Sequence, residues 1–303
     1  MIEQTEMPAI ALQGLEKIYP NGTRALRGVD FKVKQDDFIV ILGVSGAGKS
    51  TLLRCMNRLL EPTHGKVSLN GEDITHVSGR KLRLVRERVG MIFQQFNLVP
   101  RLTVLENVLA GRLIHCANPV WHGLSLLRAF PRKEKDIAFD CLRKVHIEEL
   151  AFQRANTLSG GQQQRVAIAR ALAQEPLVFL ADEPVASLDP ASADIVMEIL
   201  KEIQETSAIP VIVNLHQIEL AERFAERVMG MANGQVVFDG TRDQLSPEII
   251  EQIYGITVDR RTCRSAGRRK IAEPAVLTAP ATQGEIINDN PEPAGRKEVA
   301  PVV

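Results

Sequence analysis

Eight consecutive residues, Gly43-Val44-Ser45-Gly46-Ala47-Gly48-Lys49-Ser50, follow the pattern G-x-x-x-x-G-K-[ST]. Glycines in such a loop let backbone N–H groups approach phosphate oxygens closely. Lys49 places a cation near the β- and γ-phosphates of a nucleotide, and Ser50 offers a hydroxyl to Mg²⁺. The apolar run Phe38–Leu42 precedes the pattern and a helix-like segment follows it, so we predict a loop that binds nucleotide phosphates.

Two acidic residues, Asp182 and Glu183, come directly after the apolar run Leu177–Ala181. Open α/β sheets bind ligands at the carboxyl ends of their strands. There Asp182 can hold Mg²⁺ through its water shell, and Glu183 can face the γ-phosphate and polarise the attacking water. Because the chain also has the phosphate pattern, we interpret the pair as catalytic rather than as a solvated strand end.

Two further polar residues end apolar runs: Gln94 follows Val89–Phe93, and His216 follows Val211–Leu215. The side-chain carbonyl of Gln94 can reach Mg²⁺ or the attacking water, and His216 can donate to the γ-phosphate. A lone Gln at such a position is usually a surface residue, and a lone His is usually structural. Spacing alone leaves both interpretations open.

A second candidate anion site lies at Leu158-Ser159-Gly160-Gly161-Gln162, ahead of a helix predicted for residues 163–174. Ser159 is a good helix N-cap, and Gly160 and Gly161 expose backbone N–H groups. Two phosphate-binding helix starts suggest one nucleotide held from two sides. A chance helix cap is the alternative, and spacing does not say whether both sites belong to one subunit.

These residues need a sheet of parallel strands to bring them together. Four short apolar runs predict its buried strands, and Pro190–Ser207 predicts a helix with Ile195, Ile199 and Ile203 on one stripe. Strands that alternate with helices indicate an α/β core. The four runs are Phe38–Leu42, Val89–Phe93, Leu177–Ala181 and Val211–Leu215.

Strand-like segments flank three Asn-Gly pairs, Asn21-Gly22, Asn70-Gly71 and Asn233-Gly234. Asn-Gly supplies the two positive φ angles of a type I′ hairpin turn. We therefore predict an antiparallel β subdomain beside the parallel core. Residues 97–157 have helix-like segments and no clear strand, which predicts a helical insertion.

Composition limits the remaining possibilities. Lys plus Arg equals Asp plus Glu at 37 each, so net charge gives no argument for a nucleic-acid partner. No apolar run approaches the roughly 20 residues that cross a bilayer, and Met1–Ile10 lacks the apolar centre of a secretion signal. We expect one folded domain over residues 8–256 and a disordered tail over 257–303, basic at first and then rich in Pro and Ala. Its basic cluster is either a solvated extension or a contact for anionic lipid headgroups.

The motifs together resemble those of ABC-type ATPases. Leu158–Gln162 matches the signature of that family letter for letter, and the other elements follow the family's order along the chain. The resemblance implies a P-loop NTPase fold, with two subunits packed head to tail so that the phosphate loop of one and the signature of the other close on the same ATP. In order, the elements are Tyr19, Gly43–Thr51, Gln94, Leu158–Gln162, Asp182-Glu183, Ser187-Leu188-Asp189 and His216.

By the same resemblance, Glu183 is the general base, His216 senses the γ-phosphate and Gln94 acts with them. Mg²⁺ is held by Ser50, Gln94 and Asp182. Tyr19 stacks on the adenine, although a Tyr beside Pro20 in a hairpin is often mere packing. The ATP contacts implied are Tyr19, Gly43, Val44, Ser45, Gly46, Ala47, Gly48, Lys49, Ser50, Thr51, Ser159, Gly160, Gly161, Gln162 and Asp189.

Three segments, Gln94–Val99, Ala181–Pro190 and Val213–Gln217, resemble the phosphonate-importer branch of the family. Leu215 and Gln217 flank His216 where many ABC importers have Thr and an acidic residue. The branch implies a peripheral subunit on the cytoplasmic face of the membrane. Its partners are a second copy of itself, integral-membrane permease subunits and, indirectly, an extracytoplasmic substrate-binding protein.

Three rival hypotheses remain. The first is an importer ATPase for phosphate or phosphite, an amino acid or a metal. The second is a soluble ABC ATPase of DNA repair or translation, against which stand the single phosphate loop and the lack of sustained heptads. The third is a P-loop kinase, which has no need of Leu158–Gln162.

Overall fold

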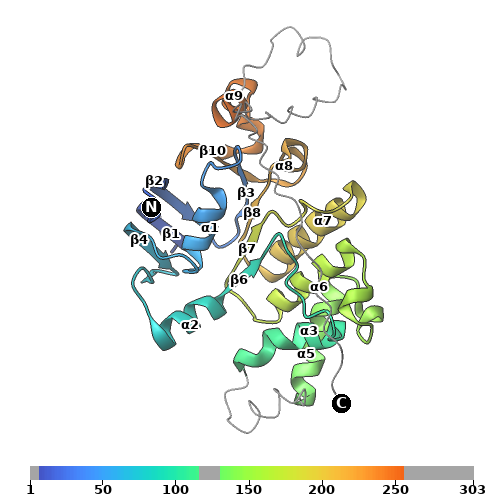
Figure 1. The fold of residues 1–303 in the computed structure, drawn as a ribbon. Coiled ribbons are helices and arrows are strands. Elements are labelled where there is room, and N and C mark those ends of the chain that lie inside the picture. The colour runs from blue at the N-terminus through green and yellow to red at the C-terminus, as the bar shows by residue number, and fades with distance from the viewer. Residues whose placement is uncertain (1–6, 116–129, 256–303) are drawn as a thin grey trace, which may run out of the picture. The chain divides into compact units, whose positions relative to one another are not determined.

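The structure is a computed structural model that describes residues 7–115 and 130–255 (Figure 1). The chain divides into two units, Met1–Val258 and Asp259–Val303, and every described residue belongs to the first. The tail expected from residue 257 lies outside the described residues, as do residues 116–129 of the expected helical insertion. Within the described ranges, no helix is long and apolar enough to span a bilayer.

The larger sheet has six strands in the order β10-β9-β3-β8-β7-β6. All four predicted strands are present in it, and neighbours from β9 to β6 pair in parallel, whereas β10 pairs antiparallel with β9. This parallel sheet confirms the predicted α/β core. The strands are β3 (Phe38–Leu42), β6 (Val89–Ile92), β7 (Val178–Asp182), β8 (Val211–Asn214), β9 (Arg227–Ala232) and β10 (Gln235–Thr241).

A second sheet of four antiparallel strands in the order β2-β1-β4-β5 confirms the predicted antiparallel subdomain. Its strands are β1 (Ile10–Ile18), β2 (Arg24–Val33), β4 (His64–Leu69) and β5 (Glu72–Asp73). In Figure 1 these strands lie beside α1, on the opposite side of the six-stranded sheet from α6 and α7.

Two of the three Asn-Gly turns have the predicted geometry. Asn70-Gly71 joins β4 to β5 with φ angles of 45° and 78°, and Asn233-Gly234 joins β9 to β10 with 52° and 79°. The prediction for Asn21-Gly22 was wrong, because only Gly22 has a positive φ, of 83°. Pro20 fixes its own φ near −65°, which favours an ordinary turn over Pro20 and Asn21 closed by a left-handed glycine.

Alternate residues of β3 belong to different hydrophobic cores. Phe38, Val40 and Leu42 pack with the core that includes α6 and α7, whereas Ile39 and Ile41 pack with α1 and the antiparallel sheet. A strand buried on both faces reads as an unbroken apolar run, which is why β3 could be predicted with its observed bounds.

Helices and short 3₁₀ turns (η) cover both faces of the six-stranded sheet (Figure 1). In the region expected to be a helical insertion, the described residues form α3, η1, α5, η2 and η3. The elements are α1 (Lys49–Met56), α2 (Gly79–Arg88), α3 (Val104–Leu109), η1 (Ala110–His115), α5 (Arg132–Lys144), η2 (Glu148–Leu150), η3 (Ala155–Thr157), α6 (Gly160–Leu172), α7 (Pro190–Ser207), α8 (Ile218–Phe224), η4 (Arg242–Gln244) and α9 (Pro247–Tyr254).

Helix α7 has the predicted bounds but not the predicted stripe. Ile199 and Ile203 are buried, whereas Ile195 is 42% exposed. The buried face is centred on Val196 and Leu200, and at 100° per residue Ile195 falls outside the arc that this face covers.

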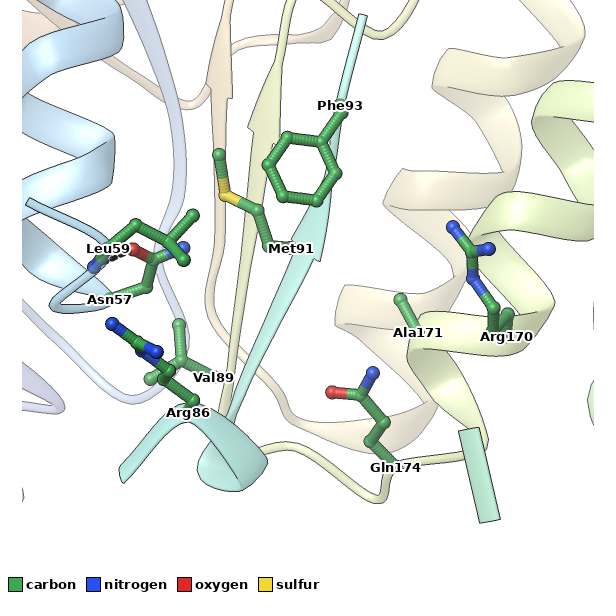
Figure 2. Close-up of a pocket in the computed structure, with 9 residues that line it drawn as sticks. All are labelled: Asn57, Leu59, Arg86, Val89, Met91, Phe93, Arg170, Ala171 and Gln174. Carbon is green, nitrogen blue, oxygen red and sulfur yellow. Dashed lines mark hydrogen bonds between the residues drawn. The ribbon is translucent and has the colours of Figure 1, made fainter. Parts of the chain in front are cut away.

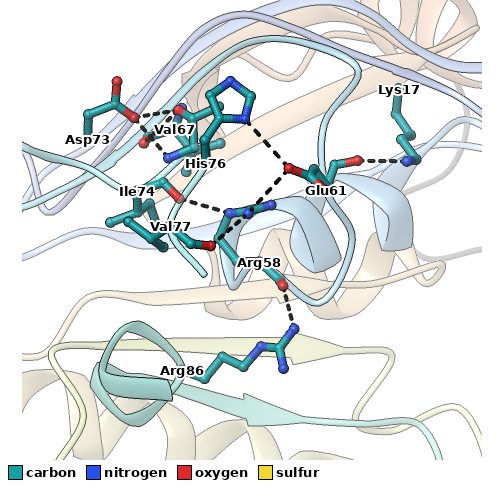
Figure 3. A network of polar contacts seen from close by, with 10 residues as sticks. Lys17, Arg58, Glu61, Val67, Asp73, Ile74, His76, Val77 and Arg86 are labelled. Carbon is teal, nitrogen blue, oxygen red and sulfur yellow. Dashed lines mark hydrogen bonds and ion pairs between the residues drawn. The ribbon is translucent and has the colours of Figure 1, made fainter. Parts of the chain in front are cut away.

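Arg58 connects the end of α1 to the antiparallel subdomain (Figure 3). Its side chain is buried, its Nε donates to the carbonyl of Ile74 at 2.8 Å, and its Nη2 lies 3.8 Å from Glu61 Oε1. Arg86 on α2 donates in turn to the carbonyl of Arg58 at 2.8 Å. Since a buried guanidinium requires its acceptors, this network fixes the segment that ends α1 against the antiparallel subdomain and α2.

Candidate functional site

The predicted phosphate loop connects β3 to α1, so its backbone leads from a buried strand into a helix N-terminus. Gly43 and Gly48 have φ angles of 156° and 101°. A Cβ at Gly43 would lie 2.3 Å from the carbonyl oxygen of Met231, and one at Gly48 would lie 2.4 Å from that of Ala25. Glycine is therefore required at both positions by contact with neighbouring backbone.

Lys49 is only 4% exposed, and its Nζ donates to the carbonyls of Gly43 and Val44 at 2.7 and 3.1 Å. Burial lowers the pKa of Lys49, and the negative charges of Glu183 and Asp182 partly oppose that effect. The loop thus holds a cation at its centre, with two carboxylates nearby.

A cleft of about 290 Å³ lies over this loop. The acid and the histidine predicted from separate strand ends, Glu183 and His216, meet there with Lys49. The sheet explains this meeting, because β3, β7 and β8 are neighbours and their carboxyl ends share one edge. The lining residues are Thr23, Ala25, Ser45, Gly46, Gly48, Lys49, Ser50, Thr51, Glu183 and His216.

Ser50 and Asp182 are in direct contact, since the hydroxyl of Ser50 donates to Asp182 Oδ1 at 2.7 Å. Asp182 is only 4% exposed. Asn214, the fully buried last residue of β8, donates from Nδ2 to the same carboxylate oxygen at 2.8 Å, and Arg54 Nη2 lies 3.4 Å from Oδ2. Oxygen atoms of a hydroxyl and a carboxylate side by side are suitable ligands for a hard cation.

Sequence reasoning missed Asn214 and Arg54 as site residues. Two signals were available. Asn214 is a polar residue at the carboxyl end of a parallel strand, as Asp182 is. Arg54 lies one helical turn after Ser50 on α1, so the two side chains share a face.

Glu183 and His216 form a hydrogen-bonded pair, with His216 Nε2 at 2.5 Å from Glu183 Oε1. Glu183 has a left-handed backbone with φ of 52°, and its amide donates to the carbonyl of Asn214 at 3.2 Å. On the other side, the hydroxyl of Tyr254 donates to the carbonyl of His216 at 3.3 Å. A carboxylate and an imidazole in this arrangement can hold and move a proton.

Several predicted residues are not part of the cleft lining: Gly43, Val44 and Ala47 of the phosphate loop, Asp182 beneath Ser50, and Tyr19 and Gln94. Tyr19 has its hydroxyl 3.2 Å from Thr51 Oγ1, next to the start of α1. Gln94 is exposed and follows β6, the strand that pairs with β7.

The second candidate anion site starts α6. Ser159 Oγ accepts from the amide of Gln162 at 3.3 Å, and Gln162 Oε1 accepts from the amide of Ser159 at 2.9 Å, which makes a capping box. Asp189 is the N-cap of α7, where its carboxylate accepts from the amide of Ser192 at 3.0 Å; hydrogen bonds from the side chain and then the amide of Ser192 lower the pKa of Asp189. A Cβ on Gly161 would lie 2.8 Å from Ser192 Oγ, so the two helix starts are neighbours. Within one subunit, Ser159–Gln162 and Asp189 are separate from the described lining of the cleft.

Residues 26–186 match the family model described as ABC transporter. The chain belongs to the ABC transporter family of ATPases. The matched region includes the phosphate loop, Gln94, Ser159–Gln162, Asp182 and Glu183 but ends before Asp189 and His216. Membership establishes that the chain binds nucleotide and hydrolyses ATP.

Curated relatives extend the likeness along most of the chain. It is 52% identical over 248 residues to the phosphonates import ATP-binding protein PhnC of Thiobacillus denitrificans, covering 82% of this chain and 93% of the relative. It is 50% identical over 252 residues to the protein of the same name from Bacillus anthracis, covering 83% and 96%.

Solved ABC ATPase structures share the fold. A dimeric ATP-binding cassette in a post-hydrolysis state bound to ADP and Pi superposes with a TM-score of 0.67 at 36% identity, over 77% of this chain and 98% of that one. CbiO1 from Clostridium perfringens, part of the transporter complex cbiONQ, gives 0.70 at 29% identity, over 82% and 94%. The P-loop NTPase fold predicted from the motifs is therefore confirmed.

Proposed function

We propose that the chain is the ATP-hydrolysing subunit of an importer that takes up phosphonates across the cytoplasmic membrane. The observation that carries the hydrolysis is the meeting of Lys49, Ser50, Glu183 and His216 at one cleft. The cargo rests on the names of relatives that share about 50% identity and nearly their whole length with this chain. Phosphate or phosphite, amino acids and metals are the alternative cargoes.

The phosphate loop holds its lysine in place with its own backbone. The carbonyls of Gly43 and Val44 hold the ammonium of Lys49 against the loop. Triphosphate oxygens in the loop add anionic acceptors to this cation, and the N–H groups at the start of α1 point the same way. Groups fixed in advance need little reorganisation during reaction, which favours charge stabilisation in phosphoryl transfer.

The residues around Ser50 fit Mg²⁺. The hydroxyl of Ser50 and the carboxylate of Asp182 would hold the ion, with Gln94 reaching it from the end of β6. Asn214 supports this pair, because its buried Nδ2 donates to Asp182 Oδ1 and so orients the carboxylate that would hold the ion. When bound, the ion neutralises charge on the phosphates.

Glu183 is placed to act as the general base. It lines the cleft with Lys49, and a water between its carboxylate and the γ-phosphate would give up its proton to Oε1 or Oε2 as it attacks phosphorus. His216 Nε2 is bonded to Glu183 and can hold that carboxylate in place, and once released from it the same N–H can donate to the γ-phosphate. Both residues follow buried strands, which limits their movement.

The start of α6 suits a nucleotide held by a second copy of the chain. The capping box uses only a lone pair of Ser159 Oγ, so the hydroxyl proton stays available to a phosphate oxygen. In one subunit Ser159 is exposed and Gln162 is half-buried. We therefore propose a head-to-tail dimer in which Ser159–Gln162 and Asp189 of each copy meet the ATP in the phosphate loop of the other, stabilised only while the γ-phosphate is present.

We propose that the permease binds in a pocket beside Gln94 (Figure 2). It lies between α1, α2 and β6 on one side and α6 on the other, with a cavity of about 250 Å³. Apolar side chains, including Met91 and Phe93, and the cations Arg86 and Arg170 line it together. Phe93 lines the pocket and immediately precedes Gln94. A permease segment that moves in the pocket can therefore displace Gln94 and so affect the ATP site.

The test uses the full chain and a Glu183→Gln variant. The variant should bind ATP and elute as a dimer on size exclusion, whereas ADP should leave it monomeric. Co-expressed with its permease subunits and substrate-binding protein, the wild-type chain should support ATP-dependent uptake of a labelled phosphonate. A variant that stays monomeric with ATP would contradict the shared site, and uptake of phosphate, an amino acid or a metal instead would replace the cargo.

A further inference from the structure

Arg170, in the last turn of α6, binds the backbone that follows Gln94. Its Nη1 donates to the carbonyl of Asn97 at 2.6 Å and its Nη2 to the carbonyl of Phe96 at 3.1 Å. Figure 2 shows Arg170 on the α6 side of the pocket, next to Ala171. One planar guanidinium thus holds two consecutive peptide groups, which a single ammonium could not do in the same way.

This contact is only partly shielded from water, since Arg170 and Phe96 are half-buried and Asn97 is exposed. Burial is the cause that lowers the pKa of Arg170. A guanidinium remains charged in proteins, and hydrogen bonds from a charged donor are stronger than neutral ones. The carbonyls of Phe96 and Asn97 therefore pair with a cation whose loss would leave them without these bonds.

The same loop is held at its far end by α3. Asn107 is 1% exposed; its Oδ1 accepts from the amide of Val99 at 2.8 Å, and its Nδ2 donates to the carbonyl of Val99 at 3.2 Å. Between the two attachments, Asn97 has a left-handed φ of 51°. The segment from Phe96 to Val99 is thus fastened to two helices, and Gln94 lies just before the first attachment.

We propose that Arg170 is a positioning residue that sets Gln94 for hydrolysis by tying its loop to α6. This inference rests on the proposed role of Gln94 in the ATP site. Helix α6 then has a function at each end: its first turn presents Ser159 to the nucleotide of the other copy, and its last turn holds the loop that serves its own nucleotide. A shift of the helix caused by one ATP is transmitted through Arg170 to Gln94 at the other.

The experiment is a double-mutant cycle on ATP hydrolysis by the full chain. Arg170→Ala and Gln94→Ala are measured alone and together, with kcat and KM for ATP determined at saturating Mg²⁺. Arg165→Ala is the matched control, because Arg165 is also on α6 but donates to the carbonyl of His146, away from the loop. Arg170→Lys is included in case the alanine variant does not fold, which thermal unfolding will show.

We expect Arg170→Ala to lower kcat about tenfold and to leave KM for ATP within about twofold, since the phosphate loop is untouched. In the Gln94→Ala background it should add no further loss, because the residue it positions is gone. Arg170→Lys should fall between wild type and Arg170→Ala, whereas Arg165→Ala should keep the wild-type kcat.

Independent, additive losses from Arg170→Ala and Gln94→Ala would overturn the inference, as would a wild-type kcat in folded Arg170→Ala or the same loss in Arg165→Ala. The proposed function fails by different observations. A wild-type chain that does not hydrolyse ATP, or a Glu183→Gln variant that does not dimerise with ATP, would contradict that function before Arg170 is considered.

Discussion

The hydroxyl of Ser50 donates a 2.7 Å hydrogen bond to Asp182 Oδ1 across 132 residues of sequence. The sheet order explains this contact, because Ser50 lies in the first turn of α1 after β3, and Asp182 ends β7, which is separated from β3 by one strand. The strand between them, β8, ends in Asn214, which binds the same carboxylate oxygen. Three polar side chains from separate motifs thus form one oxygen-rich cluster at the sheet edge.

Replacing Asn214 with Leu should weaken the metal step. The change removes the donor to Asp182 Oδ1 while keeping the size of the buried side chain, so the carboxylate loses one of the groups that orient it. We expect the Mg²⁺ concentration for half-maximal ATPase activity to rise about tenfold. Nucleotide binding measured in EDTA should be unchanged, and an equal loss in EDTA would show that the loop itself had been disturbed.

Substitutions of Tyr19 will separate adenine stacking from packing. Tyr19→Phe keeps the ring and loses only the contact with Thr51 Oγ1, so the Kd for ATP should stay within about twofold. Tyr19→Ala should raise that Kd about tenfold or more, since stacking of a base on an aromatic ring contributes roughly 1–3 kcal/mol. Fluorescent-nucleotide titration gives both values. Equal affinities for all three proteins would leave Tyr19 a packing residue of the hairpin.

Adjacent glycines at the start of α6 should respond differently to alanine. A Cβ at Gly161 would lie 2.9 Å from Ser192 Cβ, which forces the starts of α6 and α7 apart, whereas one at Gly160 would lie 3.4 Å from Leu188 Cδ2, an ordinary contact. Gly161→Ala should therefore be about 1–3 kcal/mol less stable than Gly160→Ala. Urea unfolding of the two variants measures the difference, and matching midpoints would refute it.

Two buried thiols should weaken the fold at alkaline pH. Burial raises the pKa of Cys55 and of Cys141 from 9.0 to about 11. Between those values the unfolded chain loses the thiol protons that the folded chain keeps, so stability is full below pH 9 and falls as pH rises towards 11. At the upper part of this range each thiol should account for about 1–2 kcal/mol.

The variant that tests this is Cys55→Ala with Cys141→Ala. Its unfolding free energy should be lower at pH 8, because core volume is lost, but should decline less steeply from pH 9 to 11 than that of the wild type. Parallel declines in the two proteins would mean that other groups cause the alkaline loss.

Much of the site could be predicted because strand ends are visible in sequence. Asp182, Glu183 and His216 each follow an apolar run, and a parallel sheet brings such ends to one edge whatever their separation in the chain. The ends of apolar runs do not show which strands are neighbours in the sheet. The contact between Glu183 and His216 therefore became clear only from the structure, in which β7 and β8 are adjacent. The separation of Ser159–Gln162, at the start of α6, from the cleft of the same subunit also depends on three-dimensional packing.

The errors have local physical causes. The turn at Asn21-Gly22 was mistaken because Pro20 restricts the backbone more strongly than the Asn-Gly pair does. Ile195 was predicted to be buried because it is apolar and spaced four residues from Ile199. The buried face is instead centred on Val196 and Leu200, which leaves Ile195 outside it. Arg58 and Arg170 carry charges that suggest full solvent exposure in sequence, yet each donates to backbone carbonyls in the fold. Arg54 stays exposed, and its contact with Asp182 depends on the packing of α1 beside β7.

Glu183 adopts a backbone conformation that glycine or asparagine would occupy more comfortably, with φ of 52°. Selection for heat resistance alone would therefore favour smaller residues at this position, by about 1 kcal/mol, at the expense of turnover. Libraries of this chain that are screened only for soluble yield after heating should accumulate substitutions of Glu183 that give stable but inactive proteins. On the proposed role of Glu183 as general base, a lineage that keeps glutamate there is held by catalysis against the preference of its own main chain.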